Sequence, residues 1–123
     1  MTVQEVFESA HRSATDLSPS ELASELQRVL GQKLVAFALG DRHPKTIGRY
    51  ARDDRQPDDQ TLRRLIDLYT IVSILETGMR REAVKSWMLG ANPHLHSKAP
   101  IEVFHDGRTR DVMRSAHRFV SAR

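Results

Sequence analysis

The chain of 123 residues contains no cysteine. This absence excludes disulfide bonds, thiolate chemistry and every zinc site built on cysteine. It is also compatible with a reducing compartment, so we predict a cytoplasmic protein. The length suits one domain or two very small ones.

Long apolar stretches are missing as well. No run approaches the ~20 residues that a helix needs to cross a bilayer, and we therefore predict no membrane partner. No segment alternates apolar and polar residues for long enough to form a strand. Together these absences predict an all-α protein.

Catalytic motifs are also absent from the sequence. There is no glycine-rich phosphate loop and no G-x-S-x-G elbow. His94, His96 and His105 suggest a metal cluster by their proximity, but the i,i+4 spacing typical of paired helical ligands is missing. We therefore predict no enzymatic activity, no metal and no cofactor.

What the chain does have is a pair of short helices joined at a glycine, within residues 32–52. Residues 32–39 are apolar almost all round, which predicts a buried helix. Gly40 ends this helix, because glycine enters the left-handed cap conformation without steric cost. Pro44 suits the first position of the next helix, where its missing N–H is not needed.

The second of these helices has two different sides. Lys45, Arg49 and Arg52 follow one another at spacings of four and three, so they share a face. Ile47 and Tyr50 lie on the other side. Two helices joined at a glycine turn, with cations outside the second, are typical of a helix-turn-helix, whose second helix enters the major groove of DNA. The net charge of +3 permits nucleic-acid binding.

Two further helices are predicted before this pair. Helical spacing of apolar residues indicates an amphipathic helix over 3–14. A second begins at Pro19, where Ser18 and Glu21 have the spacing of a capping box.

A long central helix is predicted over residues 61–77, with Gly78 at its end. Its apolar stripe is unusually wide, because Ile71 and Ile74 lie beside the main row. This width indicates burial on two sides, and we expect the second side to meet another copy of the chain in a homodimer.

The C-terminal third predicts three more short helices. The first covers 82–89, the second starts at Pro100 and ends by Gly107, and the third covers 109–122. We expect the chain to divide into three parts: N-terminal helices with the helix-turn-helix (1–57), a linking helix (58–79) and a small C-terminal helical domain (80–123).

The helix-turn-helix resembles the lambda-repressor/Cro (Xre) family. The resemblance rests on Gln32 opening the first helix, Ala36 at the helix crossing, Gly40 in the turn, Ile47 as the inward anchor and Tyr50 at a common aromatic position. It implies a double-stranded DNA interface made of Gln32, Lys33, Arg42, Lys45, Thr46, Arg49 and Arg52. The chain departs from the family by one extra residue between Gly40 and Ile47.

The C-terminal third is similar to the Xre/MbcA/ParS toxin-binding domain. The similarity rests on the run Trp87-Met88-Leu89-Gly90-Ala91-Asn92-Pro93-His94-Leu95, then Ala99-Pro100, Phe104, Gly107-Arg108, Val112, Ala116 and Phe119. Members of this family are typically antitoxins that block a RES-domain toxin, which degrades NAD, and repress their own operon. The resemblance implies a partner surface made of Asn92, Pro93, Leu95, Arg114, Arg118 and Arg123.

Two alternatives remain beside a DNA-binding antitoxin. One is a stand-alone dimeric transcriptional regulator or nucleoid-type DNA-binding protein without a toxin. The other is a protein-interaction module that no longer binds DNA, which the longer turn and the acidic pair Asp53 and Asp54 favour. DNA binding would place the cytoplasmic protein at the nucleoid.

Overall fold

The computed structural model describes residues 2–122, which form eight α-helices and one short 3-10 helix. They are α1 (Val3–Thr15), α2 (Pro19–Leu30), α3 (Gln32–Leu39), α4 (Lys45–Ala51), α5 (Asp59–Glu76), α6 (Arg81–Leu89), η1 (Pro93–Leu95), α7 (Pro100–His105) and α8 (Thr109–Ser121). No strand occurs within this range, where an isolated bridge joins Asn92 and Lys98. The prediction of an all-α fold is confirmed.

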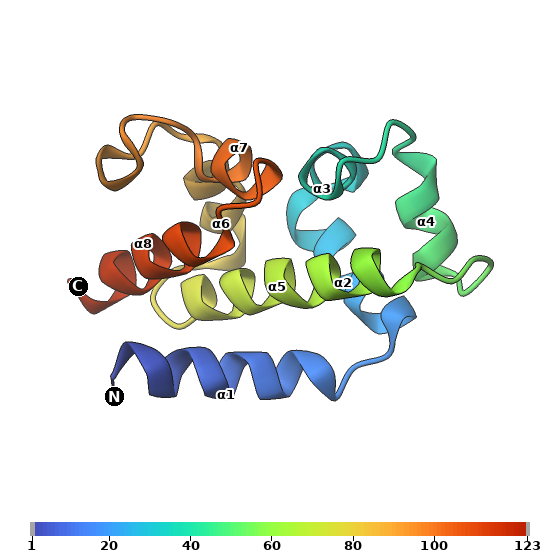
Figure 1. The fold of residues 1–123 in the computed structure, drawn as a ribbon, viewed down its shortest axis with the longest axis horizontal. Coiled ribbons are helices and arrows are strands. Elements are labelled where there is room, and N and C mark those ends of the chain that lie inside the picture. The colour runs from blue at the N-terminus through green and yellow to red at the C-terminus, as the bar shows by residue number, and fades with distance from the viewer. Residues whose placement is uncertain (1, 123) are drawn as a thin grey trace.

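The longest helix, α5, runs through the middle of the molecule, and the others are arranged around it (Figure 1). Helix α1 lies along α5, and α8 lies near both chain ends and contacts α1 and α5. Helices α3 and α4 gather at the other end of α5. Helices α6 and α7 lie between these two groups, where α7 contacts both α3 and α8.

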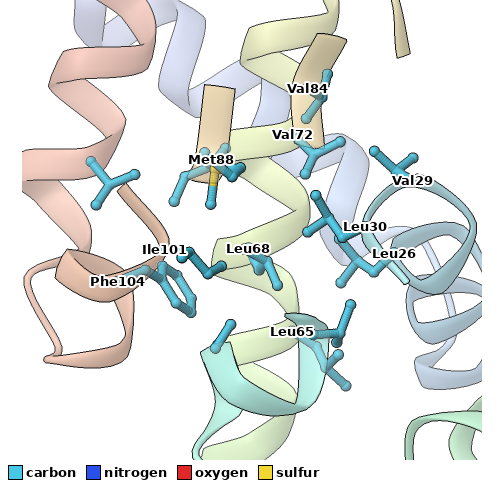
Figure 2. Close-up of a cluster of buried hydrophobic side chains, with 14 of the residues drawn as sticks. Leu26, Val29, Leu30, Leu65, Leu68, Val72, Val84, Met88, Ile101 and Phe104 are labelled. Carbon is cyan, nitrogen blue, oxygen red and sulfur yellow. The ribbon is translucent and has the colours of Figure 1, made fainter. Parts of the chain in front are cut away.

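One hydrophobic core joins all three parts of the chain (Figure 2). Its fully buried members come from the N-terminal, central and C-terminal segments alike, and they include Leu26, Leu30, Leu65, Leu68, Val84, Met88 and Phe104. The central helix is thus the middle of the core, and the segments 1–57 and 80–123 both pack onto it. Unlike a linker between separate units, α5 is buried by both of them.

The extra apolar width of α5 has an explanation within the chain. Ile71 and Ile74 are 0% and 1% exposed. Ile74 borders a groove together with Val6 of α1 and Val120 of α8. The interpretation that this width indicates a partner copy was therefore wrong, because α1 and α8 already cover the second side of α5.

Local signals set several helix ends as expected. Ser18 accepts a hydrogen bond from the Glu21 backbone N–H at 3.1 Å, and the Glu21 carboxylate accepts one from the Ser18 N–H at 2.9 Å. The bond from the Ser18 backbone N–H to the carboxylate lowers the pKa of Glu21. Asp58 caps α5 by accepting from the Thr61 N–H at 2.7 Å. None of the helices described is both long and apolar enough to cross a membrane.

Candidate nucleic-acid interface

The connection between α3 and α4 covers residues 40–44 and is held by backbone and side-chain hydrogen bonds. Gly40 has a φ of 73°, the left-handed cap that the sequence predicts. Asp41 then accepts a hydrogen bond from the His43 N–H at 2.8 Å, which folds the chain back. Pro44 stands one position before the first residue of α4, where the sequence predicts it at the first helical position, and its backbone angles are already helical (φ −54°, ψ −31°).

Helix α4 is fixed to α2 through its inner side and its last carbonyl. Ile47 and Tyr50 are buried at 0% and 6% exposure, as their spacing predicts. Ser20 donates a hydrogen bond to the Ala51 carbonyl at 2.7 Å, and Ser24 lies within 3.3 Å of the same oxygen. These bonds satisfy a carbonyl that the end of the helix would otherwise leave without a partner.

The outer side of α4 is cationic and exposed. Lys45, Arg49 and Arg52 are exposed, as are Arg42 before the helix and Arg55 after it. Arg52 forms an ion pair with Asp54 at 3.0 Å. Within residues 2–122, the other four form no ion pair within 4.0 Å of a carboxylate. We refer to these five residues as the α4 surface.

Two residues expected at the DNA interface are engaged inside the protein. Thr46 is only 3% exposed, because it belongs to the buried side of α4. Gln32 is half-buried and donates a hydrogen bond to Gln27 at 3.1 Å. Its amide lies over Gly48, where an added Cβ would approach it to 2.7 Å. The expectation that Thr46 contacts DNA is therefore wrong for this conformation, whereas Lys33 is exposed as expected.

The loop after α4 contains one cation that the sequence reading missed. Arg55 borders the same shallow hollow as His43, Lys45 and Arg49. The sequence signal was hidden because Arg55 follows the acidic pair Asp53 and Asp54, which favours the alternative without DNA binding. Its position beside the start of α4 depends on how the loop folds back. Asp54, which faces Arg52, reduces the positive charge here by one.

Helix α3 is not buried all round, which corrects the sequence interpretation. Phe37 is 42% exposed, and its ring stacks on His105 of α7 with 4.5 Å between centroids. His105 Nδ1 also lies 2.8 Å from the Phe37 carbonyl. Because a carbonyl oxygen only accepts, Nδ1 carries the hydrogen. His105 therefore serves this contact and does not gather with His94 and His96.

Arg64 of α5 strengthens the same junction between α3 and α7. Its guanidinium donates to the Ala38 carbonyl at 2.7 Å and to the Phe104 carbonyl at 2.9 Å. It also lies 4.3 Å from the centroid of the Phe104 ring, a cation–π contact. Burial lowers the pKa of Arg64. One side chain thus ties the helix before the turn to the C-terminal third.

The residues expected to meet a protein partner divide into buried and exposed ones. Asn92 is 7% exposed and accepts a hydrogen bond from the His94 N–H at 2.9 Å. Leu95 is 3% exposed and belongs to the core. Both hold the turn in place, so their expected role as contacts is wrong for this conformation. Pro93 is exposed.

The expected arginines of the last helix are on the surface. Arg114 and Arg118 are exposed on α8, while Arg123 lies outside the described residues. The sequence reading missed two exposed apolar side chains in the C-terminal third: Leu89, at the end of α6, is 50% exposed, and Phe119 of α8 is 39% exposed. The rings of Trp87 and Phe119 meet edge to face at 6.2 Å.

Comparisons with protein-family models, with curated proteins and with solved structures found no match to this chain.

Proposed function

We propose that this protein binds double-stranded DNA through the α4 surface. The observation that carries the proposal is the arrangement of α4 itself. Its apolar side is buried on α2, and its opposite side presents Lys45, Arg49 and Arg52 to solvent. A short helix fixed from behind, with cations in front, suits insertion into a major groove.

The residues of the α4 surface divide into two roles. Arg49 lies in the middle of the exposed side and is our candidate for reading a base, because its guanidinium matches the two acceptors on a guanine edge. Arg42 and Arg55 flank the helix and are our candidates for phosphate contacts. Phosphate contacts fix the register of a protein on DNA, and base contacts give the sequence preference.

Selection of bound sequences from a random duplex library, followed by titration of the best sequence, tests this proposal. If Arg49 reads a base, Arg49→Ala should weaken the best sequence by ~1–3 kcal/mol and relax the preference at one position. Arg110→Ala, an exposed arginine on α8, is the matched control and should leave binding unchanged. Equal losses in both variants, or no selected sequence, would contradict the proposal. Two protected half-sites about one helical turn apart would support the expected homodimer.

Salt dependence separates phosphate contacts from base contacts. Lys33 is exposed at the start of α3, and Lys33→Ala should weaken all sequences alike and reduce the salt slope by about one unit. Gln32 is bonded to Gln27, so Gln32→Ala should leave that slope unchanged. A slope that does not respond to Lys33→Ala would exclude this lysine from the interface.

A second proposal concerns a protein partner at the other end of the molecule. Leu89 and Phe119 expose apolar surface in the C-terminal third, and the exposed Arg118 precedes Phe119 in sequence, on the segment that is similar to the toxin-binding domain. The resemblance leads us to propose an antitoxin that neutralises a RES-type toxin and represses its own operon together with it. Exposed apolar side chains beside cations are typical of contact surfaces.

Purification from the host, with and without nuclease, distinguishes an antitoxin from a DNA-binding regulator that has no toxin. An antitoxin should retain a stoichiometric partner after nuclease treatment, and that partner should degrade NAD once it is released. Leu89→Lys should abolish the retention. Deletion of α8 is unsuitable because this helix buries Val112 and Ala116 in the core. Recovery of a discrete DNA sequence without a protein would instead favour a stand-alone regulator.

A further inference from the structure

A hollow of about 460 Å³ lies between α8, the η1 turn and the start of α1. Its lining includes the hydrogen-bonding side chains His94, His96, Arg108, Arg114, Ser115 and Arg118, and also Val3 and Asp111. We refer to it as the α8 pocket. Its volume falls within the range of sites for small ligands. Helices α8 and α4 lie at different ends of α5 (Figure 1).

Positive charge in the α8 pocket is only partly balanced. Asp111 accepts a hydrogen bond from Arg108 Nε at 2.8 Å, and a second guanidinium nitrogen of Arg108 lies 2.7 Å from the same oxygen, so this ion pair balances Arg108. Arg114 and Arg118 form no ion pair within 4.0 Å among the described residues. They stand four positions apart on one helix and therefore share a face. Two positive charges thus face the same hollow.

The contact of Arg118 with His94 adds to the imbalance. A guanidinium nitrogen of Arg118 lies 3.1 Å from His94 Nδ1. Because arginine has no acceptor, His94 accepts through the lone pair of a neutral ring. Arg118 therefore has a nitrogen as its partner here and keeps its full charge. A ligand with acceptor oxygens would be a stronger partner.

Ser115 supplies an independent sign of a missing partner. The residue is 3% exposed, and its hydroxyl oxygen is buried without a hydrogen bond within the described protein. Burying a hydroxyl without a partner is costly, so such groups are rare in folded proteins. Ser115 lies between Arg114 and Arg118 in sequence and borders the same hollow.

We propose that the α8 pocket binds the phosphate group of a small phosphorylated molecule. A phosphate offers three acceptor oxygens, and the pocket offers the guanidinium groups of Arg114 and Arg118 and the imidazole of His96, with the Ser115 hydroxyl buried in its wall. The hollow is much larger than a phosphate ion, which favours an ester of nucleotide size. This proposal does not depend on DNA binding, because it uses no residue of the α4 surface.

Isothermal titration calorimetry at fixed ionic strength tests the proposal with three probes: inorganic phosphate, adenosine monophosphate and adenosine. Both phosphate compounds should bind saturably with one site per chain, and adenosine should not bind. Tighter binding of the monophosphate would identify an ester as the ligand class. Equal affinities would identify the free ion.

Variants then locate the binding within the pocket. Arg114→Gln and Arg118→Gln should each weaken phosphate binding about tenfold, since charge-assisted hydrogen bonds are the strong ones. Ser115→Ala should weaken it several-fold without lowering the Tm, because it removes a hydroxyl that has no partner in the folded chain. Arg110→Gln, on the same helix but outside the pocket, is the control and should bind as the parent does.

Several results would overturn the proposal. One is the absence of saturable binding of either phosphate compound at millimolar concentration. Another is an equal loss in Arg110→Gln, which would indicate an unspecific charge effect. A third is a lower Tm with unchanged phosphate binding in Ser115→Ala, which would make this serine purely structural. Loss of duplex DNA binding in Arg118→Gln, without any monophosphate binding, would assign the arginines to the DNA backbone instead.

Discussion

The α4 end and the α8 end of the molecule are both rich in arginine, but they present it differently. At α4, exposed cations project from a short helix that is held from behind by α2 and α3. At α8, arginines border a hollow together with a buried hydroxyl, on a helix that also packs on α1, α5 and α7. The first setting suits a long polyanion and the second a small one. The same residue type therefore supports two different proposals.

The two ends share one hydrophobic core, and polar contacts connect them as well. Arg64 and His105 connect α3 to α7 and so link one end to the other. If this link is effective, a change in the shared core should destabilise both ends together. If it is not, α4 should loosen separately, because its main contacts are with α2 and α3.

The largest effect is expected for Phe104→Ala. Phe104 is fully buried, so the loss of its ring should lower the free energy of unfolding by ~3–5 kcal/mol. Urea denaturation measures this value, and hydrogen exchange should show loss of protection in α4 and α8 alike. Phe119→Ala is the control, and its loss should be smaller because Phe119 is 39% exposed. Protection that persists in α4 would show that the two ends unfold separately.

Removing the guanidinium of Arg64 tests the link itself. Arg64→Met keeps much of the apolar stem but leaves the Ala38 and Phe104 carbonyls without this donor. We expect a loss of roughly 1.5–3 kcal/mol, the range for hydrogen bonds to a charged group. Arg63→Met changes the exposed neighbour and should stay within about 0.5 kcal/mol of the parent. Equal values for the two variants would mean that the contacts of Arg64 contribute nothing to stability.

Replacing one glycine at each end of the molecule by alanine should change the free energy of unfolding in opposite directions. An added Cβ at Gly78 would lie 2.8 Å from the Val120 Cβ and 3.3 Å from its Cα, so Gly78→Ala should push α8 away and cost ~1–3 kcal/mol. At Gly48 the close atom is the mobile end of Gln32. Gly48→Ala should therefore gain up to about 1 kcal/mol from helix propensity. Thermal denaturation gives both signs, and a loss at Gly48 would show that Gln32 cannot move aside.

The sequence predicts those features that neighbouring residues determine. The capping box at Ser18, the left-handed Gly40 and the buried side of α4 depend on spacing along one segment, and the structure has all three. Exposure depends on distant segments. Thr46 and Leu95 were therefore placed at interfaces although they are buried, and the isolated hydroxyl of Ser115 was missed. Ile71 and Ile74 show the same limit, since only the fold reveals that both are buried within one chain, with α1 and α8 packed on α5.

The smallest effect is expected for a substitution of Asp67. This residue lies on α5, the helix that connects the two ends. Burial raises the pKa of Asp67 above its ordinary 3.8, although His11 and Arg64 oppose this shift. The folded protein thus holds this proton more tightly than the unfolded chain, and the carboxylate reduces stability at pH 7. The cost disappears as the pH falls through the raised pKa towards 3.8. Asp67→Asn should therefore raise the Tm slightly at pH 7, and the gain should vanish below the pKa of the unfolded chain. A lower Tm at pH 7 would mean that attraction to His11 and Arg64 outweighs burial, and that the charge helps to hold α5 between its two ends.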